Sequence, residues 1–379
     1  MREYLTVFLV AAAVTYLLGV FAREVALRTG AVARVRDRDV HAVPIPYFGG
    51  VAMLGGLVAA YLVGARLPFL SRADDQVFRD GAVVLVAGAL ICLLGVLDDL
   101  LELDALTKLG GQIVVAGILV AFDVYYYSFQ LPGEGQFIAD PVQGQLMSVV
   151  VVVATINAVN FVDGLDGLAA GVVGIGAVAF FLFSYKLADA NGETLAITAA
   201  LLCAALGGAC VGFLPHNFFP ARIFMGDSGS MLIGLVLAGS ALTLTGQFAT
   251  VNMTQGAGGS EASLLPTLLP ILLPISILVV PFADLVLAVI RRTRAGRSPF
   301  APDKQHLHHR MLEIGHSHRR AVLIMWLWAG LIAFGGVLAS LYAGRLTTIV
   351  IAVWVVLTVA LTFVLPRVQH PHSSPQPQS

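Results

Sequence analysis

Eleven stretches of this chain are apolar for close to the 20 residues that an α-helix needs to cross a lipid bilayer. Because lipid offers no hydrogen-bond partners, a spanning segment must satisfy its own backbone N–H and C=O groups, as an α-helix does. The chain is therefore predicted to be an all-α polytopic membrane protein with about eleven transmembrane helices. The predicted spans lie near residues 4–22, 47–64, 81–97, 110–127, 145–160, 167–185, 195–214, 228–246, 264–290, 321–341 and 346–366.

The composition supports the same class of protein. Hydrophobic residues make up 58% of the 379 residues and charged residues 12%, whereas a soluble domain carries about 25% charged residues. The net charge of −1 gives no electrostatic reason to expect nucleic acid as a partner. We expect residues 1–366 to form a single integral-membrane domain. The polar, proline-rich residues 367–379 are expected to form a disordered cytoplasmic tail.

The basic residues of the loops predict which side faces the cytoplasm. Sixteen of the 22 Lys and Arg residues fall on the side that holds residues 23–46, and six fall on the other side. Since cytoplasmic loops carry the excess of Lys and Arg, the N-terminus is predicted to lie outside and the C-terminus inside. The first apolar run is interpreted as a retained helix, because it is nearly span length and has no clear small-residue cleavage site.

Polar side chains gather in the loops on this cytoplasmic side. The loops on the opposite side, by contrast, resemble plain polar connectors. We therefore predict a single active site in a cleft at the cytoplasmic face. The polar stretches are 98-DDLLELDALTK-108, 157-NAVNFVDGLDG-167, 215-PHNFFPARIFMGDSGS-230 and 302-PDKQHLHHR-310.

Two adjacent acids, Asp98 and Asp99, follow the third apolar run directly. Two neighbouring carboxylates repel each other, which raises the pKa of one of them. Binding of a cation or a role as a base would account for such a pair. The alternative is a charged helix end that marks the membrane boundary.

Asp163 and Asp166 lie between two apolar runs, and each is followed by glycine. If the turn is helical, the two carboxylates share a face. If it is not, the glycines permit an otherwise strained loop. The simpler alternative is that Asp166 caps the next helix, but capping does not account for Asn157 and Asn160 at helical spacing before it.

The stretch 226-GDSGS-230 opens an apolar helix with an aspartate, two serines and two glycines. Free N–H groups at a helix N-terminus favour phosphate binding, although capping alone is the simpler interpretation. Magnesium is commonly held by one or two carboxylates together with substrate phosphates. Asp227 is therefore a candidate magnesium ligand.

The stretch 306-HLHHR-310 lies in the longest cytoplasmic loop. A zinc site needs three or four Cys, His or acidic ligands, and no cysteine is near, so a phosphate-handling cluster fits better. Charge anchoring at the membrane surface is the alternative, and it is preferred for the neighbouring 291-RRTRAGR-297. Asp284, inside the ninth span, is either functional or a partner of Arg291 or Arg292.

Together these motifs resemble the polyprenyl-phosphate N-acetylhexosamine-1-phosphate transferases. That family combines an adjacent aspartate pair, an NxxNxxDGxDGL stretch, a GDxGS stretch and a histidine-rich cytoplasmic loop. The likeness runs from about 35-VRDRDVHAVPIPYFGG-50 to residue 310. The loop reads HLHHRML here, where the peptidoglycan branch typically has HHHFE. The chain therefore looks like the WecA/TagO-like branch, which uses UDP-GlcNAc or a related UDP-N-acetylhexosamine.

The resemblance implies the reaction. N-acetylhexosamine-1-phosphate, most simply GlcNAc-1-phosphate, would pass from the UDP-sugar to polyprenyl phosphate with release of UMP. This would be the first membrane step of a cell-wall or surface-glycan pathway, at the bacterial plasma membrane. The cofactor would be Mg²⁺, with Mn²⁺ as a substitute, and homodimers are common in the family. The alternatives are a phospho-MurNAc-pentapeptide transferase and, from another class, an ion-coupled transporter, whose acids should lie near the bilayer midplane.

The resemblance also implies roles for the candidate residues. Asp227 would bind the metal, with Asp98 and Asp99 as further candidate ligands, and Asp98 would deprotonate or orient the lipid phosphate. Direct attack by that phosphate is favoured over a covalent phospho-enzyme, because both charged substrates can be held in line. The catalytic candidates are Asp98, Asp99, Asp227, His306, His308 and His309, the histidines steadying the diphosphate or sugar. The substrate-binding candidates are Lys108, Asn157, Asn160, Asp163, Asp166, Asn217, Phe224 and Arg310, with Asn217 and Phe224 at the uracil.

Overall fold

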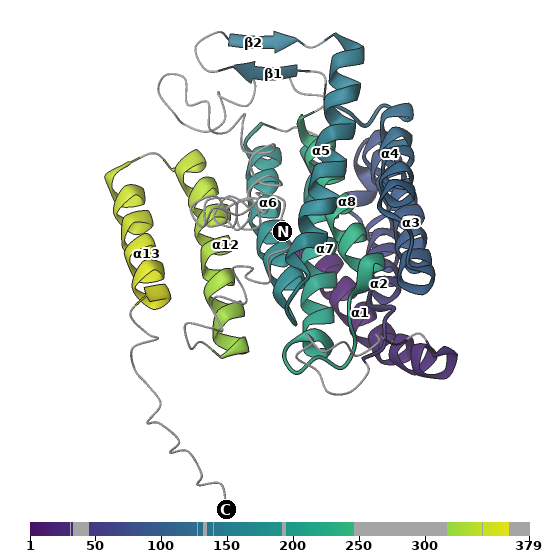
Figure 1. Ribbon diagram of the computed structural model, residues 1–379. Coiled ribbons are helices and arrows are strands. Elements are labelled where there is room, and N and C mark those ends of the chain that lie inside the picture. Colours follow the sequence, from purple (N-terminus) through teal and green to yellow (C-terminus); the bar gives the residue numbers. More distant parts are fainter. Residues whose placement is uncertain are drawn as a thin grey trace, which may run out of the picture.

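The computed structural model describes residues 1–30, 32, 45–126, 128–131, 135–138, 140–191, 195–245, 317–342 and 344–363. These residues form a bundle of α-helices (Figure 1). A single 3₁₀ turn, η1 (Leu70–Arg72), separates the second and third helices. The helices are α1 (Arg2–Thr29), α2 (Gly49–Gly64), α3 (Asp75–Leu101), α4 (Ala105–Ala121), α5 (Pro141–Val162), α6 (Leu168–Asn191), α7 (Leu195–Asn217), α8 (Gly226–Thr245), α12 (His318–Leu341) and α13 (Arg345–Phe363).

Each predicted span that falls on described residues corresponds to one of these helices. Among the described residues, eight helices are long and apolar enough to cross a membrane. The other two, α2 and α4, are apolar but shorter, at 16 and 17 residues. The helical, multi-span class is therefore confirmed for the described residues. The ninth predicted span, near residues 264–290, lies outside them, and the total of eleven stays a prediction.

A short β-hairpin between α4 and α5 was not predicted. Strands β1 (Ser128–Leu131) and β2 (Gly135–Ile138) pair antiparallel, with Ser128 opposite Ile138. The fourth span was predicted to run to residue 127, but α4 ends at Ala121. The sequence that follows, 122-FDVYYYSFQ-130, is rich in aromatic residues, which favour extended strands. Hydrophobicity alone does not separate such a segment from the end of a helix.

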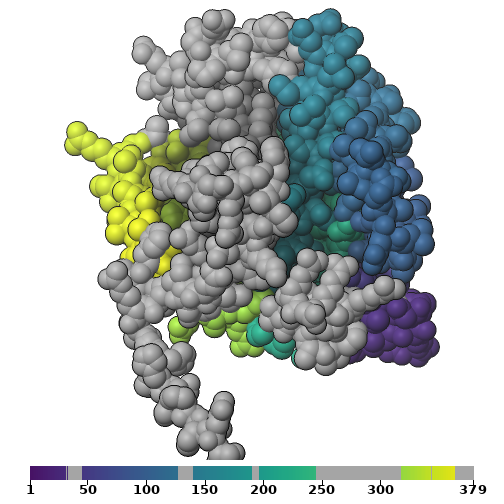
Figure 2. Space-filling model, viewed as in Figure 1, coloured from purple at the N-terminus to yellow at the C-terminus, as the bar shows by residue number. Residues whose placement is uncertain are grey.

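Helix α8 lies at the centre of the bundle. It contacts α2, α3, α5 and α7, and 94% of its span-length apolar segment is buried inside the protein. Helix α13 lies at the edge of the bundle, where it contacts α12. Only 6% of its span-length apolar segment is buried. The space-filling view shows α3 to α5 forming one flank (blue to teal) and α13 (yellow) the other (Figure 2). The peripheral helices therefore present their apolar faces to lipid.

Glycines let the ends of two helices, α2 and α3, approach the start of α8 closely. A Cβ atom at Gly50, near the start of α2, would lie 2.3 Å from the backbone nitrogen of Gly229. A Cβ at Gly95, near the end of α3, would lie 2.4 Å from the Cα of Ser228. No real Cβ contact is that short, so only glycine allows this approach. The backbones of α2 and α3 thereby fix where the first turn of α8 lies.

Candidate active site

The turn between α3 and α4 brings Asp98 and Lys108 together. Glu102 adopts the left-handed conformation (φ 51°) and donates its N–H to the carbonyl of Asp98 at 2.9 Å. The carboxylate of Asp98 accepts the N–H of Leu103 at 2.9 Å. Asp104 then caps α4, because its carboxylate accepts from the first-turn amides. Lys108, one turn into α4, therefore faces back toward the end of α3.

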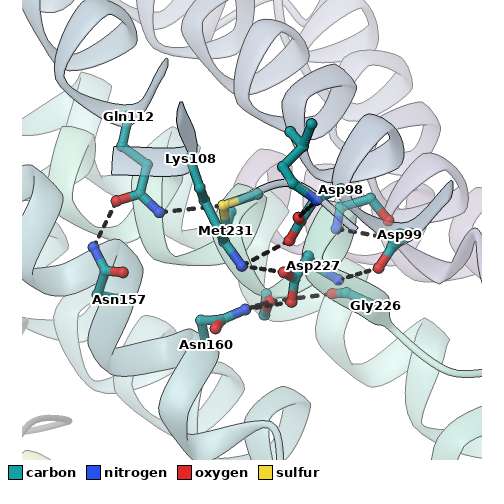
Figure 3. A network of polar contacts seen from close by, with 12 residues as sticks. Asp98, Asp99, Lys108, Gln112, Asn157, Asn160, Gly226, Asp227 and Met231 are labelled. Atoms are coloured by element: carbon teal, nitrogen blue, oxygen red, sulfur yellow. Dashed lines mark hydrogen bonds and ion pairs between the residues drawn. The ribbon is translucent and has the colours of Figure 1, made fainter. Parts of the chain in front are cut away.

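The ammonium of Lys108 bonds two carboxylates from different helices (Figure 3). Its Nζ is 2.9 Å from Oδ2 of Asp98 and also bonds Oδ2 of Asp227. The three side chains are partly shielded, with exposed fractions of 19% for Lys108, 12% for Asp98 and 28% for Asp227. The structure thus brings together three predicted site residues that are up to 129 positions apart in the sequence.

Asn160, near the end of α5, holds Asp227 from the other side. Its Nδ2 donates to Oδ1 of Asp227 at 2.6 Å and to Oγ of Ser230 at 2.9 Å. Ser230 was not among the predicted residues. Its signal was present, since it lies three residues after Asp227 and so on the same face of α8.

Asn157 contacts a residue that was not predicted. Its Nδ2 donates to Oε1 of Gln112 at 2.6 Å, and Gln112 in turn donates to the sulfur of Met231 at 3.4 Å. Gln112 is fully buried. A signal for it existed, because a glutamine four residues after Lys108 in an apolar run shares its helical face. Asn157 is therefore connected to α8, the helix that carries Asp227, through Gln112 and Met231.

Asp99 faces the backbone of α8. Its carboxylate accepts the N–H of Asp227 at 2.9 Å and that of Ser228 at 3.3 Å. Gly226 has a left-handed φ of 69°, and a Cβ there would lie 2.5 Å from Asp99. Two of the amides proposed for phosphate binding thus donate to Asp99. The adjacent acids have different partners: Asp98 bonds Lys108, and Asp99 caps the helix that carries Asp227.

The segment between α5 and α6 is a loop. Asp163 ends α5, and Gly167 has a left-handed φ of 78°, so the loop alternative is correct. The carboxylate of Asp166 accepts the N–H of Ala221 at 2.9 Å, and this side chain is buried. Loop 163–167 is thereby tied to loop 218–225.

Asn217 reinforces that connection. Its Oδ1 accepts the N–H of Gly167 at 2.9 Å, and its Nδ2 donates to the carbonyl of Ile223 at 3.1 Å. The side chain is 3% exposed. Asn217 and Asp166, both predicted on the nucleotide side, therefore set the shape of the two loops there.

Asp163 lies in a strongly acidic environment. Withdrawal from water raises the pKa of its carboxyl from the ordinary 3.8 to about 8, and the charges of Asp227, Asp99 and Asp166 act in the same direction. Without a bound metal ion, a carboxyl with this pKa is expected to hold its proton at neutral pH.

Phe224, predicted at the uracil, lies against the segment that precedes α2. Its ring centroid is 6.4 Å from that of Tyr47. Its N–H donates to the carbonyl of Pro46 at 2.9 Å, and its own carbonyl accepts the N–H of Gly49 at 3.1 Å. Tyr47 was not predicted, although it falls inside the stretch that carries the resemblance.

The start of α12 touches the same loop. His318 stacks on Phe219 with ring centroids 4.4 Å apart, and Nε of Arg319 donates to the carbonyl of Phe219 at 3.0 Å. The remaining predicted residues lie outside the described residues. These are His306, His308, His309 and Arg310, together with Asp284.

The chemistry of the donor atoms bears on the predicted magnesium. Within the described ranges, no group of three or more His, Cys, Asp or Glu side chains is arranged to hold a metal ion. Asp98 and Asp227, however, already share one cation, the ammonium of Lys108. Magnesium needs only one or two protein carboxylates when substrate phosphates supply the rest. Asp98 and Asp227 therefore fit a magnesium ion, whereas both oxygens of Asp99 accept backbone amides.

Comparison with known proteins places these motifs in a family. Residues 82–245 match glycosyl transferase family 4. The chain is 45% identical to the decaprenyl-phosphate N-acetylglucosaminephosphotransferase of Mycolicibacterium smegmatis, over 96% of this chain and 89% of that protein. It is 46% identical to the protein of the same name from Mycobacterium tuberculosis, over 92% and 86% of the two chains.

A more distant relative has the same chemistry in its name. The undecaprenyl-phosphate alpha-N-acetylglucosaminyl 1-phosphate transferase of Escherichia coli is 28% identical, over 84% of this chain and 79% of its own length. The match therefore extends over nearly the whole bundle and includes the segments that form the Asp98–Lys108–Asp227 cluster. The chain belongs to glycosyl transferase family 4, among the polyprenyl-phosphate N-acetylglucosamine-1-phosphate transferases.

Proposed function

We propose that this chain transfers GlcNAc-1-phosphate from UDP-GlcNAc to polyprenyl phosphate, releasing UMP, at the cytoplasmic face of a bacterial plasma membrane. The observation that carries the proposal is the cluster of Asp98, Lys108 and Asp227 at converging helix ends. It occurs in a chain that is 45% identical, over 96% of its length, to an enzyme named for this transfer. Membership in a transferase family also favours an enzyme over the ion-coupled transporter.

The reaction is a phosphoryl transfer between two charged substrates. An oxygen of polyprenyl phosphate attacks the β-phosphorus of UDP-GlcNAc. The bond between that phosphorus and the bridging oxygen breaks, and its electron pair leaves with UMP. Such reactions depend on alignment and on stabilisation of the developing charge more than on covalent chemistry. Direct attack therefore stays our proposal, and the aspartates need not become phosphorylated.

The residues of the cluster have separate tasks in this proposal. Asp98 orients the lipid phosphate or takes its proton, and Lys108 offers a positive charge to the diphosphate. Bound Mg²⁺, held by Asp227 and Asp98, would neutralise phosphate charge. Asp99 fixes the first turn of α8 through its two backbone contacts. Asp166 and Asn217 hold the loops that carry Phe224 toward the nucleotide.

The surroundings of the cluster suit a lipid substrate. Leu101 and Leu106, in and beside the α3–α4 turn, expose 66% and 80% of their surface, and Phe161 at the end of α5 exposes 72%. Exposed apolar side chains next to a polar cluster are expected where a site opens both to lipid and to water. A lipid phosphate can then reach the acids while its prenyl chain stays in the membrane.

The sugar is proposed to be GlcNAc because the relatives are named for N-acetylglucosamine. The test is UMP release by the detergent-purified protein, with polyprenyl phosphate, Mg²⁺ and UDP-GlcNAc, UDP-GalNAc or UDP-MurNAc-pentapeptide. We expect release with UDP-GlcNAc that requires both lipid and metal. Preference for UDP-MurNAc-pentapeptide would reassign the branch, and release without the lipid would contradict the proposed acceptor. Homodimerisation and the cytoplasmic orientation of the site stay predictions.

A further inference from the structure

Each of the two carboxylates that contact Lys108 also accepts a hydrogen bond from another residue. For Asp98, Oδ1 accepts the N–H of Leu103 at 2.9 Å while Oδ2 faces the lysine. For Asp227, Oδ1 accepts Nδ2 of Asn160 at 2.6 Å while Oδ2 faces the lysine. One oxygen of each acid is thus fixed by the protein, and the other points at a shared position. Loss of the lysine would leave both oxygens aimed at that position.

We propose that Lys108 and the divalent metal ion are alternative occupants of the position that Oδ2 of Asp98 and Oδ2 of Asp227 both face. Lys108 neutralises the acids before the metal binds. Metal binding expels the ammonium, which then pairs with the diphosphate of the nucleotide sugar. This inference rests on the proposed function, because it takes Asp227 as a metal ligand.

Electrostatics supports exchange over joint occupancy. A divalent and a monovalent cation a few Å apart repel each other, and two carboxylates attract the divalent ion about twice as strongly at the same distance. Oδ2 of Asp98 and Oδ2 of Asp227 both bond the ammonium, so a metal bound to the same two oxygens would take its place (Figure 3).

Lys108 can leave without unfolding its helix. It carries a flexible four-carbon stem and lies in the first turn of α4. Leu106 and Leu109, on either side of it in that helix, are exposed at the surface of the protein. The side chain therefore has an open direction in which to move.

The first test measures metal binding without substrate. Binding of Mn²⁺ to the full-length detergent-purified protein is followed by the electron paramagnetic resonance signal of free Mn²⁺. Lys108→Met, which removes the charge, is expected to bind Mn²⁺ about tenfold or more tightly than the unaltered protein. Lys108→Arg keeps the charge and is expected to stay within about threefold, as is the remote control Lys186→Met. Unchanged or weaker affinity in Lys108→Met would overturn the exchange.

Asp227→Asn separates this inference from the proposed metal site. If Mn²⁺ binding depends on Asp227 but not on the charge at residue 108, the exchange is wrong and the metal assignment stands. If Asp227→Asn binds Mn²⁺ as tightly as the unaltered protein does, the metal assignment itself is wrong, and the exchange falls with it.

The second test needs no substitution. An amine-acylating reagent is applied with and without Mg²⁺, and modification of each lysine is quantified by peptide mass spectrometry. Mg²⁺ is expected to raise labelling of Lys108 several-fold, because the freed ammonium loses both carboxylate partners. Lys186, exposed on α6, is the internal control and should not change. Equal or lower labelling of Lys108 in Mg²⁺ would contradict its displacement.

Discussion

Asp98 and Asp99 are neighbours in the sequence, yet one bonds a lysine side chain and the other bonds two backbone amides. The sequence indicated that a pair of acids at a helix end serves more than a boundary. It could not indicate which acid faces which partner, because that depends on how α3 meets α8. The same limit applies to Lys108 and Asp227, which are 119 residues apart.

Asp227 is the residue on which the proposed chemistry depends most. Asp227→Asn keeps an oxygen that can accept from Asn160, so we expect the fold to be retained. It removes one of the two carboxylates that face the shared cation position. Turnover should therefore fall by about 10²-fold or more, a size typical for loss of one electrostatic contact in an active site. UMP release and circular dichroism of the purified variant measure the two effects, and activity within a few-fold of normal would contradict the metal assignment.

The raised pKa of Asp163 predicts a pH-dependent stability of the metal-free protein. The folded state holds this proton up to about pH 8, whereas the unfolded chain releases it near 3.8. The folded state therefore binds more protons between these values, and the free energy of unfolding falls as pH rises through that window. Thermal unfolding in detergent with a chelator should show a Tm that declines from pH 5 to 8. The decline should be shallower in Asp163→Asn, and an equal slope in both proteins would refute the assignment.

At the scale of elements, the sequence predicted the helices well, because each is a long apolar run. The prediction was less accurate for segments whose structure does not follow from the length of an apolar stretch. The end of α4 and the β-hairpin were missed, since aromatic residues suit a strand and a membrane helix alike. Polar residues inside helices, such as Gln112, were missed although their spacing was informative.

Contact between α3 and α8 is predicted to be sensitive to a single methyl group. In Gly95→Ala, the new Cβ would lie 2.4 Å from Ser228, so α3 must move away from the start of α8. We expect a loss of about 1–3 kcal/mol in stability, together with reduced turnover. Gly117→Ala on α4 is the matched control, because nothing lies within 4 Å of its Cβ. Unfolding in detergent compares the two, and equal stability would show that the close approach is not required.

At the scale of the whole molecule, the loops that form the site are predicted to face the cytoplasm. In a background without Cys92, Cys203 and Cys210, all of which are buried, single cysteines report the sidedness of each loop. Glu102→Cys, in the α3–α4 turn, should react only with reagents admitted to the cytoplasm. Ser71→Cys, at the other end of α3, should react from outside. Labelling of Glu102→Cys from outside in intact cells would invert the topology.

The central claim is that this face of the bundle transfers a sugar phosphate, and not the sugar alone, to a lipid. The most direct measurement uses UDP-GlcNAc labelled with ³²P at the β-phosphate, polyprenyl phosphate and Mg²⁺, followed by separation of lipid from water-soluble products. We predict that the label moves to the lipid fraction, that this requires polyprenyl phosphate, and that Asp227→Asn slows it by about 10²-fold or more. Label that stays in the water-soluble fraction as UDP, while GlcNAc reaches the lipid, would contradict the account.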